Sequence, residues 1–481
     1  MGRLILVSTR LPVTVEEDGG ALSVRPSSGG LASGLRAPHR RLGGLWVGWH
    51  GSAAPVDRDR QAQLAARLAT LNAVSVDLSE QEVQLFYDGF TNGVLWPLFH
   101  YLPDRIALRP DGWREYGAVN ARFADAVAAH YRAGDTIWVH DYQLLLLPAL
   151  LRQRLPRARI GFFLHIPFPS SELFTTLPQR ELLLHGMLGA DLVGFHTAAY
   201  RRHFVSTVER VLGIRCGEEH VRIGGRRARL GVFPMSVDAH AFSQRVSSPE
   251  VLREVHGLRG DGSCKLLIGI DRLDYTKGIP RRLLALEELL HRRPEWRGRV
   301  RLIQVAVPSR TRAEAYRAFR QEVDAIVGRI HGNFGTPDWT PVHYLYRSIP
   351  EAQLLALYRA ADVMLVTPVR DGMNLVAKEF VATRSDEDGV LVLSEFAGAA
   401  AELGGAVAVN PYDLTGSAER YHDALMMPAP ERRERMRALR ERVLTYDVHA
   451  WVREFLAALG AEALAEGGAA AAVEAPTSPA R

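Results

Sequence analysis

Two groups of residues in the second half of the chain have the types and spacing that bind a diphosphate. One is the polar loop Arg370–Asn374, which stands between an apolar run and a helical pattern, with Asn374 at the expected N-cap. The other is the cation pair Arg272 and Lys277, just ahead of a helix expected to start near Pro280. A helix N-terminus behind a strand presents unpaired N–H groups and a positive dipole end, and both bind anions. The sequence therefore predicts a diphosphate site at these helix starts.

Two further residues extend this prediction to a nucleotide. Glu379 falls in the second turn of the helix behind the loop, where its carboxylate can accept hydrogen bonds from ribose hydroxyls. Gly372, in the turn ahead of that helix, is able to take backbone angles that are closed to other residues. The plainer alternatives are an ordinary strand, loop and helix with a surface carboxylate, and cations that are merely solvated. Both alternatives stay open on these residues alone.

In the first half of the chain, polar side chains follow three apolar runs that are typical of strands. These residues are Arg10, Asp141 and His165, at the ends of the runs 4–7, 136–140 and 160–164. The carboxyl ends of parallel strands meet at one edge of a sheet, so we expect the three side chains to converge. A single histidine at a strand end is more often structural than catalytic, but three polar ends together favour a site. The unusually aromatic stretch 86–101 suits a sugar ring.

The elements that must position these residues alternate between strand and helix. Short apolar runs rich in β-branched residues indicate buried parallel strands. Besides the three above, they are expected at 191–196, 266–270, 300–307, 363–366 and 389–393, and 430–459 is expected to be helical and amphipathic. A chain of 481 residues exceeds what one hydrophobic core usually serves. The pattern predicts an α/β protein with two facing, doubly wound parallel-sheet domains and a ligand cleft between them.

Composition argues against several classes of protein. Hydrophobic residues make up 47% of the chain and charged residues 23%, as in ordinary globular proteins. The net charge of +5 comes with only brief arginine runs, so we expect no nucleic-acid partner. Cys216 and Cys264 provide neither a disulfide framework nor metal-ligand spacing, which indicates a reducing cytoplasm. No apolar run reaches the roughly 18 residues of a membrane span, so no membrane association is expected.

Several separated motifs resemble a single family. They are 363–382, Arg272–Gly278, His140–Tyr142 and Phe162–Pro169. Together they closely resemble the trehalose-6-phosphate synthase family of retaining glycosyltransferases, glycosyltransferase family 20. The resemblance implies the GT-B fold, with two Rossmann-like domains and an interdomain cleft. The acceptor-binding domain is then expected at 1–236, the nucleotide-sugar donor domain at 237–440, and a crossover helix at about 441–460 packs back on the first domain. The segment 461–481 is expected to be a disordered tail, because small residues and proline dominate its end.

The resemblance also assigns roles to individual residues. For the donor, these are Gly29 and Gly30 closing over the diphosphate, Arg272 and Lys277 binding it, Asp371 contacting the sugar hydroxyls, the backbone of Gly372, Met373, Asn374, Leu375 and Val376 holding sugar and phosphate, and Glu379 binding the ribose. For the acceptor, glucose 6-phosphate, they are Arg10, Tyr87, Trp96, Asp141 and Arg310. His165 is expected to hydrogen-bond the transferred sugar near its reacting carbon. The catalytic candidates are His165, Asp141, Arg272, Lys277 and Asp371.

The activity that the resemblance implies is transfer of glucose from a nucleotide-glucose, such as UDP-glucose, to glucose 6-phosphate. The product is α,α-trehalose 6-phosphate, and attack occurs on the leaving-group face, where the departing diphosphate takes the acceptor proton. Because positive charge stabilises that leaving group, no metal ion or other cofactor is expected. Asp386 and Asp388 match a metal-binding pair by spacing only and indicate a solvated loop. No phosphatase half is expected, so the product would keep its phosphate.

Two departures from the family pattern leave the acceptor open. Thr9 stands where the family usually has asparagine, and Gln143 where histidine is common. One alternative is a related transferase that uses glycerol 3-phosphate or an aminocyclitol phosphate, but the intact Arg10, Tyr87, Trp96 and Arg310 favour glucose 6-phosphate. Another is a catalytically silent regulatory member, which would be expected to lose donor-site residues, and none is lost here. Partners are expected to be small-molecule substrates. The base of the donor (UDP, ADP or GDP) and the oligomeric state, including a homo-oligomer, stay open.

Overall fold

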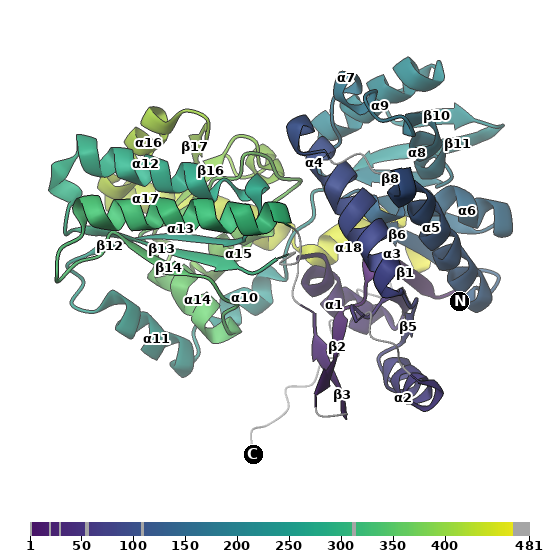
Figure 1. The fold of residues 1–481 in the computed structure, drawn as a ribbon, viewed down its shortest axis with the longest axis horizontal. Helices are drawn as coiled ribbons and strands as arrows, with labels where there is room; N and C mark the ends of the chain where they lie inside the picture. Colours follow the sequence, from purple (N-terminus) through teal and green to yellow (C-terminus); the bar gives the residue numbers. More distant parts are fainter. Residues whose placement is uncertain are drawn as a thin grey trace. The chain divides into compact units, whose positions relative to one another are not determined.

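The computed structural model describes residues 2–18, 21–27, 30–52, 57–106, 110–309 and 314–464. The chain divides into two compact units (Figure 1). Unit 1 comprises Met1–Pro234 and Val448–Arg481, and unit 2 comprises Met235–Asp447. The chain therefore passes from one unit to the other twice. None of the helices in the described ranges is long and apolar enough to cross a bilayer.

Unit 1 is built on a nine-stranded sheet in the order β5-β4-β1-β6-β7-β8-β11-β10-β9. Neighbours from β5 to β11 run parallel, and β10 and β9 are added by antiparallel pairing. Strands β1, β6 and β8 are buried almost throughout, which explains their continuous apolar sequences. The strands are β1 (Leu4–Arg10), β4 (Leu45–Trp49), β5 (Ala73–Ser75), β6 (Thr136–His140), β7 (Arg159–Phe163), β8 (Leu192–Phe195), β9 (Cys216–Gly217), β10 (His220–Ile223) and β11 (Arg226–Val232), with a separate hairpin of β2 (Val13–Asp18) and β3 (Ala21–Pro26).

The helices of unit 1 include one of unusual type. The segment η1 (Val83–Leu95) is a π-helix, in which each hydrogen bond spans five residues instead of four. The others are α1 (Gly30–Leu42), α2 (Arg58–Ala69), α3 (Glu80–Glu82), α4 (Trp96–Phe99), α5 (Pro110–His130), α6 (Leu147–Arg154), α7 (Ser171–Phe174), α8 (Arg180–Met187), α9 (Ala198–Leu212) and α18 (Val448–Ala458), with short 3₁₀ turns η2 (Pro103–Arg105) and η3 (Tyr142–Leu144).

Helix α18 packs on the sheet of unit 1 although it follows unit 2 in the chain. The ring of Phe455 stacks on Trp138 of β6, with 4.3 Å between the ring centroids. Gly161 of β7 and Gly194 of β8 make room for this ring, because a Cβ at either position would lie 2.8 Å from one of its carbons. Nearby, the Trp451 indole N–H donates to the Phe233 carbonyl at 3.1 Å.

The segment 430–459, expected to be helical, forms two helices with a break between them. Helix α17 (Ala429–Thr445) ends in unit 2, and α18 begins at Val448 in unit 1. Tyr446 leaves helical angles, with φ −120° and ψ 77°, where the chain passes between the units. The crossover helix expected at about 441–460 is accordingly divided between α17 and α18.

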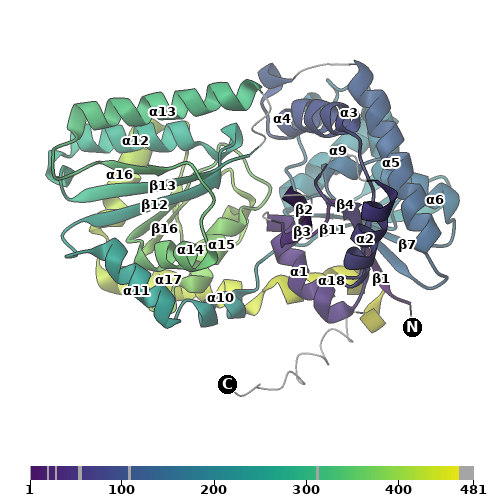
Figure 2. The same cartoon turned by 60° about the horizontal axis from the view of Figure 1, so that its bottom comes forward.

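Unit 2 contains a six-stranded sheet whose neighbours all run parallel, in the order β14-β13-β12-β15-β16-β17. Helices cover both faces of this sheet (Figure 2), as the doubly wound prediction requires. The strands are β12 (Lys265–Arg272), β13 (Val300–Val307), β14 (Val342–Leu345), β15 (Val363–Val366), β16 (Val390–Ser394) and β17 (Val407–Val409). The helices are α10 (Ala239–Arg245), α11 (Pro249–Arg259), α12 (Ile279–Arg292), α13 (Glu314–Phe334), α14 (Glu351–Ala360), α15 (Leu375–Thr383), α16 (Leu414–Met426) and α17, with 3₁₀ turns η4 (Tyr275–Lys277), η5 (Pro294–Trp296) and η6 (Gly398–Ala401).

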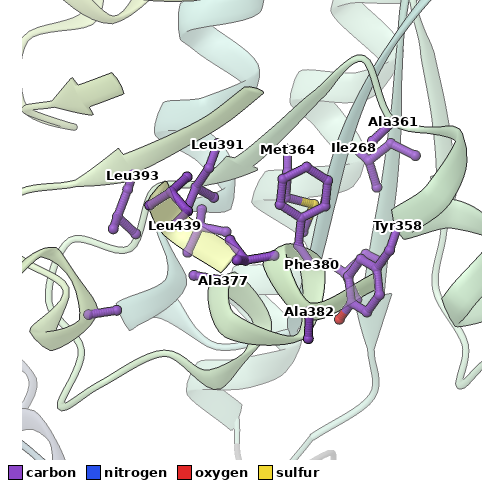
Figure 3. Packing of buried hydrophobic residues seen from close by; sticks show 14 of the residues in the cluster. Ile268, Tyr358, Ala361, Met364, Ala377, Phe380, Ala382, Leu391, Leu393 and Leu439 are labelled. Atoms are coloured by element: carbon purple, nitrogen blue, oxygen red, sulfur yellow. The ribbon is translucent and has the colours of Figure 1, made fainter. Parts of the chain in front are cut away.

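The core of unit 2 encloses the two elements that flank the loop at Asp371. Figure 3 shows Met364 of β15 and Phe380 of α15 in one buried cluster with Ile268 of β12 and Leu391 of β16. These four side chains are at most 1% exposed. Because both ends of the loop are anchored in this core, its polar residues are held in place by apolar packing.

Candidate functional site

An ion pair joins the loop after β15 to the loop after β12. Lys277 Nζ lies 2.5 Å from Asp371 Oδ2, and the side-chain amide of Asn374 donates to the same oxygen at 3.0 Å. The Lys277 and Asp371 side chains are only 12% and 13% exposed. They meet because β12 and β15 are neighbouring parallel strands whose carboxyl ends share one edge. A cation from one sequence motif and a carboxylate from the other thus form one cluster.

Backbone contacts fix the shape of the Asp371 loop. The Val369 N–H donates to the Thr276 carbonyl at 2.9 Å, and the Asp371 carbonyl accepts from the Gly398 N–H at 3.1 Å. Position 398 requires glycine, because a Cβ there would lie 1.9 Å from the Gly372 carbonyl oxygen. The turn η6 is therefore packed directly against the backbone of the loop, which has little freedom to move.

Asn374 caps helix α15, as predicted from its position in the sequence. Its side chain accepts from the Ala377 N–H at 3.4 Å. The left-handed residue of this loop is Asn374, with φ 78°, and not the neighbouring Gly372. Asparagine tolerates this conformation since its short side chain can bond locally. The helix thus begins with Leu375 and Val376, whose N–H groups have no partner within the helix.

A buried arginine, Arg282, joins the strands behind the same cluster by hydrogen bonds. Arg282 is 1% exposed, and its guanidinium donates to Asp271 Oδ2 at 2.5 Å, to Gln304 Oε1 at 2.9 Å and to Thr367 Oγ1 at 3.0 Å. Burial raises the pKa of Asp271, and the neighbouring Arg282 opposes that rise. Sequence reasoning missed this network. The available signal was that Arg282 stands three residues after Ile279, on the apolar face of α12.

The remaining donor candidates of unit 2 lie close to this loop in the chain. Met373 is 3% exposed and Gly372 is also buried, whereas Arg272 is exposed at the end of β12. Glu379 Oε2 accepts from the Tyr358 hydroxyl at 2.7 Å, and burial raises the pKa of Glu379. A carboxylate that already holds one donor has three lone-pair positions left for ribose hydroxyls.

In unit 1, two of the three polar strand ends come together, as predicted. The ring nitrogen His140 Nδ1 lies 3.0 Å from His165 Nε2. The backbone N–H of His165 donates to Asp141 Oδ1 at 3.1 Å. Asp141 follows β6 directly and His165 lies two residues after β7, and these two strands are parallel neighbours. Asp141 has φ 76°, and its own N–H donates to the Phe163 carbonyl at 2.8 Å. Burial lowers the pKa of His140 to about 3 and that of His165 well below its ordinary value.

The third strand end, Arg10, joins the aromatic residues of unit 1. Its guanidinium carbon lies 4.9 Å from the centroid of the Trp49 ring, which in turn lies 5.7 Å from the ring of Tyr87. Its Nη2 donates to Thr14 Oγ1 at 3.2 Å. A Cβ at Gly51 would lie 2.1 Å from Arg10 Nη2, so this glycine makes room for the guanidinium. A cation beside an aromatic face suits a phosphorylated sugar.

The π-helix η1 positions both aromatic acceptor candidates. Tyr87 lies within it, and Trp96 is the first residue after it. The Trp96 ring lies 5.6 Å from that of Tyr142, whose hydroxyl donates to Asn92 Oδ1 at 2.8 Å. π-Helical segments are rare in proteins, and those that occur are often found at functional sites. Sequence reasoning identified the aromatic residues but not the helix type, because no periodic pattern distinguishes it.

Three candidate residues cannot be placed beside these clusters. Gly29 and Arg310 fall outside the described residues, and Gly30 is the exposed first residue of α1. Within the described ranges, no group of three or more histidine, cysteine or acidic residues could hold a metal ion. Asp386 and Asp388 are not merely solvated, because both pair with arginines; Arg384 donates to Asp386 Oδ2 at 2.9 Å.

Comparisons with known proteins place this arrangement in context. The family model described as Glycosyltransferase family 20 matches residues 2–461. The chain is 43% identical, over 94% of its length, to the α,α-trehalose-phosphate synthase [UDP-forming] A of Dictyostelium discoideum, but spans only 61% of that protein. It is 41% identical to the 56 kDa subunit of the corresponding Kluyveromyces lactis enzyme, covering 95% of both chains.

A solved structure extends the comparison to the fold. The crystal structure of a UDP-forming α,α-trehalose-phosphate synthase from Burkholderia xenovorans, in complex with glucose-6-phosphate, matches with a TM-score of 0.85 at 35% identity. The match covers 95% of this chain and all of that one. The GT-B fold class predicted from the sequence is therefore confirmed.

Proposed function

Because the chain belongs to glycosyltransferase family 20, we propose that it transfers glucose from UDP-glucose to glucose 6-phosphate and forms α,α-trehalose 6-phosphate. The observation that carries the proposal is the cluster of Lys277, Asp371 and Asn374 at the N-terminus of α15. It combines a cation, a carboxylate and helix N–H groups, which are the groups that a sugar diphosphate requires. UDP is the proposed leaving group because the relatives are named UDP-forming.

Unit 2 would bind the donor. Lys277 and the exposed Arg272 would neutralise the diphosphate, together with the backbone N–H groups of residues 372–376. Asp371 would accept hydrogen bonds from the glucose hydroxyls, and Glu379 from the ribose. Binding would replace part of the Lys277–Asp371 contact with contacts to the ligand.

Unit 1 would bind the acceptor. Arg10, beside the rings of Trp49 and Tyr87, offers a guanidinium for the phosphate of glucose 6-phosphate. Trp96 offers an aromatic face, and Asp141 a carboxylate for the hydroxyls. His165 would donate a hydrogen bond to the transferred glucose. Gly29, Gly30 and Arg310 keep the roles that the family resemblance assigns to them.

The reaction would proceed on one face of the donor sugar. The bond between the anomeric carbon and the diphosphate oxygen breaks, and a bond to the anomeric hydroxyl oxygen of glucose 6-phosphate forms on the same side. The departing diphosphate takes the proton of that hydroxyl. The protein's contribution would be electrostatic stabilisation of the leaving group.

The test is product identification. The purified full chain is incubated with UDP-, ADP- and GDP-glucose, each with glucose 6-phosphate, glucose, glycerol 3-phosphate or an aminocyclitol phosphate. The expected result is UDP release and a disaccharide phosphate with an α,α-1,1 linkage by NMR, formed only with glucose 6-phosphate. Product with another acceptor would identify a related transferase, and no product with any pair would overturn the proposal.

We further propose that the reaction needs no metal ion and takes place in the cytoplasm. Asp386 and Asp388 are engaged by arginines, and both cysteines are free thiols. Unchanged turnover after exhaustive dialysis against EDTA is the expected result. Loss of turnover that Mg²⁺ or Mn²⁺ restores would contradict the metal-independent mechanism.

A further inference from the structure

His140 has an unusual hydrogen-bonding position behind His165. It is fully buried at the end of β6, and its Nδ1 lies 3.0 Å from His165 Nε2. Its other ring nitrogen, Nε2, is buried and has no hydrogen-bond partner among the residues that the structure describes. The His196 ring also packs edge-on to His165, with 5.4 Å between centroids. The two nitrogens of His140 therefore have different environments, which constrain where its proton lies.

Counting protons decides between two arrangements. Burial lowers the pKa of both rings, so both are neutral near pH 7 and each carries one ring proton. Only one proton can lie between His140 Nδ1 and His165 Nε2. If it belongs to His165, the proton of His140 must be on Nε2, as a buried donor without an acceptor. If it belongs to His140, Nε2 is only a bare acceptor. A buried N–H donor without an acceptor is rarer in proteins than a buried acceptor without a donor. The second arrangement is therefore favoured.

We propose that His140 is a positioning residue that donates from Nδ1 to His165 and thereby fixes His165 as its Nδ1–H tautomer. His165 then offers a donor, and not a lone pair, on its remaining nitrogen. Asp141 holds the same residue through its backbone, since Asp141 Oδ1 accepts from the His165 N–H. Two adjacent residues thus fix the backbone and the ring of His165 separately. The inference rests on the proposed function only in taking the transferred glucose as the acceptor of this hydrogen bond.

The direct test is NMR of the full chain labelled with ¹⁵N-histidine. Two-bond ¹H–¹⁵N correlations report the tautomer of each ring, and a His165→Gln variant assigns the signal. In the unliganded protein, His165 is expected as the pure Nδ1–H form. In His140→Phe, which removes the donor, the tautomer preference should be lost. Turnover should then fall by about 10- to 100-fold, the range for removing the partner that orients a metal-bound histidine, with little change in the KM for glucose 6-phosphate.

Two further variants separate positioning from simple packing. His140→Asn keeps an N–H donor close to the place of Nδ1, so it should recover both the Nδ1–H tautomer and most of the turnover. His203→Asn is the matched control, because His203 also lies in unit 1 and its Nδ1 bonds the Phe168 carbonyl at 3.1 Å. It should change neither the His165 signal nor turnover.

Two results would overturn the proposal: an Nε2–H tautomer of His165 in the unmodified chain, or the unmodified tautomer and turnover in His140→Phe. If circular dichroism shows that His140→Phe is unfolded, the spectra of the unmodified chain and His140→Asn decide. If no sugar is transferred by any form, the proposed function fails. The spectra of the unliganded chain still test the hydrogen bond in that case.

Discussion

A single methyl group added at Gly398 should displace the loop at Asp371, which we propose binds the donor. In Gly398→Ala the new Cβ would lie 1.9 Å from the Gly372 carbonyl oxygen and 2.8 Å from the carbonyl carbon. Real Cβ atoms essentially never approach other atoms closer than 3.0 Å, and the obstructing atoms are backbone, which cannot rotate away. The loop must therefore shift by about 1 Å. A shift of that size can cost about 10²-fold in rate when it moves binding groups.

The assay is initial-rate kinetics with each substrate varied in turn. We expect kcat/KM for UDP-glucose to fall by about 10²-fold, because the displaced backbone no longer presents residues 372–376 to the donor. The KM for glucose 6-phosphate should change little, since its proposed site lies in unit 1. Calorimetric titration with UDP should show the same loss of affinity without turnover. Thermal unfolding should show a loss of about 1–3 kcal/mol from overpacking.

Gly404→Ala is the matched control for this variant. Gly404 follows the same turn, but a Cβ there would meet nothing within 4 Å, so kinetics and stability should stay close to those of the unmodified chain. The reasoning is refuted if folded Gly398→Ala keeps the unmodified kcat/KM for UDP-glucose. That outcome would mean that the loop at Asp371 does not hold the donor.

Three other perturbations test separate parts of the molecule. Lys277→Met should lower turnover by about 10²-fold or more, by analogy with loss of a preorganised charge-stabilising donor, as measured with saturating substrates. Gly51→Ala should raise the KM for glucose 6-phosphate but not for UDP-glucose, because the methyl would displace the guanidinium of Arg10. Arg432 lowers the pKa of Asp388 from its ordinary 3.8 to about 2, so this contribution to stability is present above about pH 4 and is lost as pH falls towards 2. Asp388→Asn should therefore lower Tm at pH 7, through a loss of no more than about 1 kcal/mol of unfolding free energy for this partly exposed pair, and should lower Tm less at pH 2.

Each of these has a result that would contradict it. Unchanged turnover in Lys277→Met would contradict the proposal that the Lys277 ammonium stabilises the leaving group. An equal rise of both KM values in Gly51→Ala would indicate general distortion, since φ is 92° at this glycine, instead of a specific effect on the acceptor. A Tm difference for Asp388→Asn that does not shrink on acidification would show that packing, not charge, links this loop to α17.

Local patterns were enough to predict the framework of the site. The apolar run 363–366, the polar loop and Asn374 predicted a strand, a turn and a capped helix, and β15, the loop and α15 have that form. The rule that parallel strands end at one edge correctly brought His165 close to Asp141. It also brought the cation and carboxylate motifs of unit 2 together. These predictions succeed because periodicity, capping and strand direction depend on near neighbours in the chain.

Contacts between distant residues were decided only by the tertiary structure. Arg282, with its partners Asp271 and Thr367, could not be recognised as a buried network until α12 was packed on the sheet. The π-helix of η1, the break between α17 and α18, and the need for glycine at 398 likewise depend on what surrounds the backbone in space. The sequence by itself thus determined which strands, turns and helices hold the candidate residues, and their order along the chain. Tertiary packing decided which side chains contact one another. Contacts between residues far apart in the chain produce no periodic pattern in the sequence, so they could not be predicted from it.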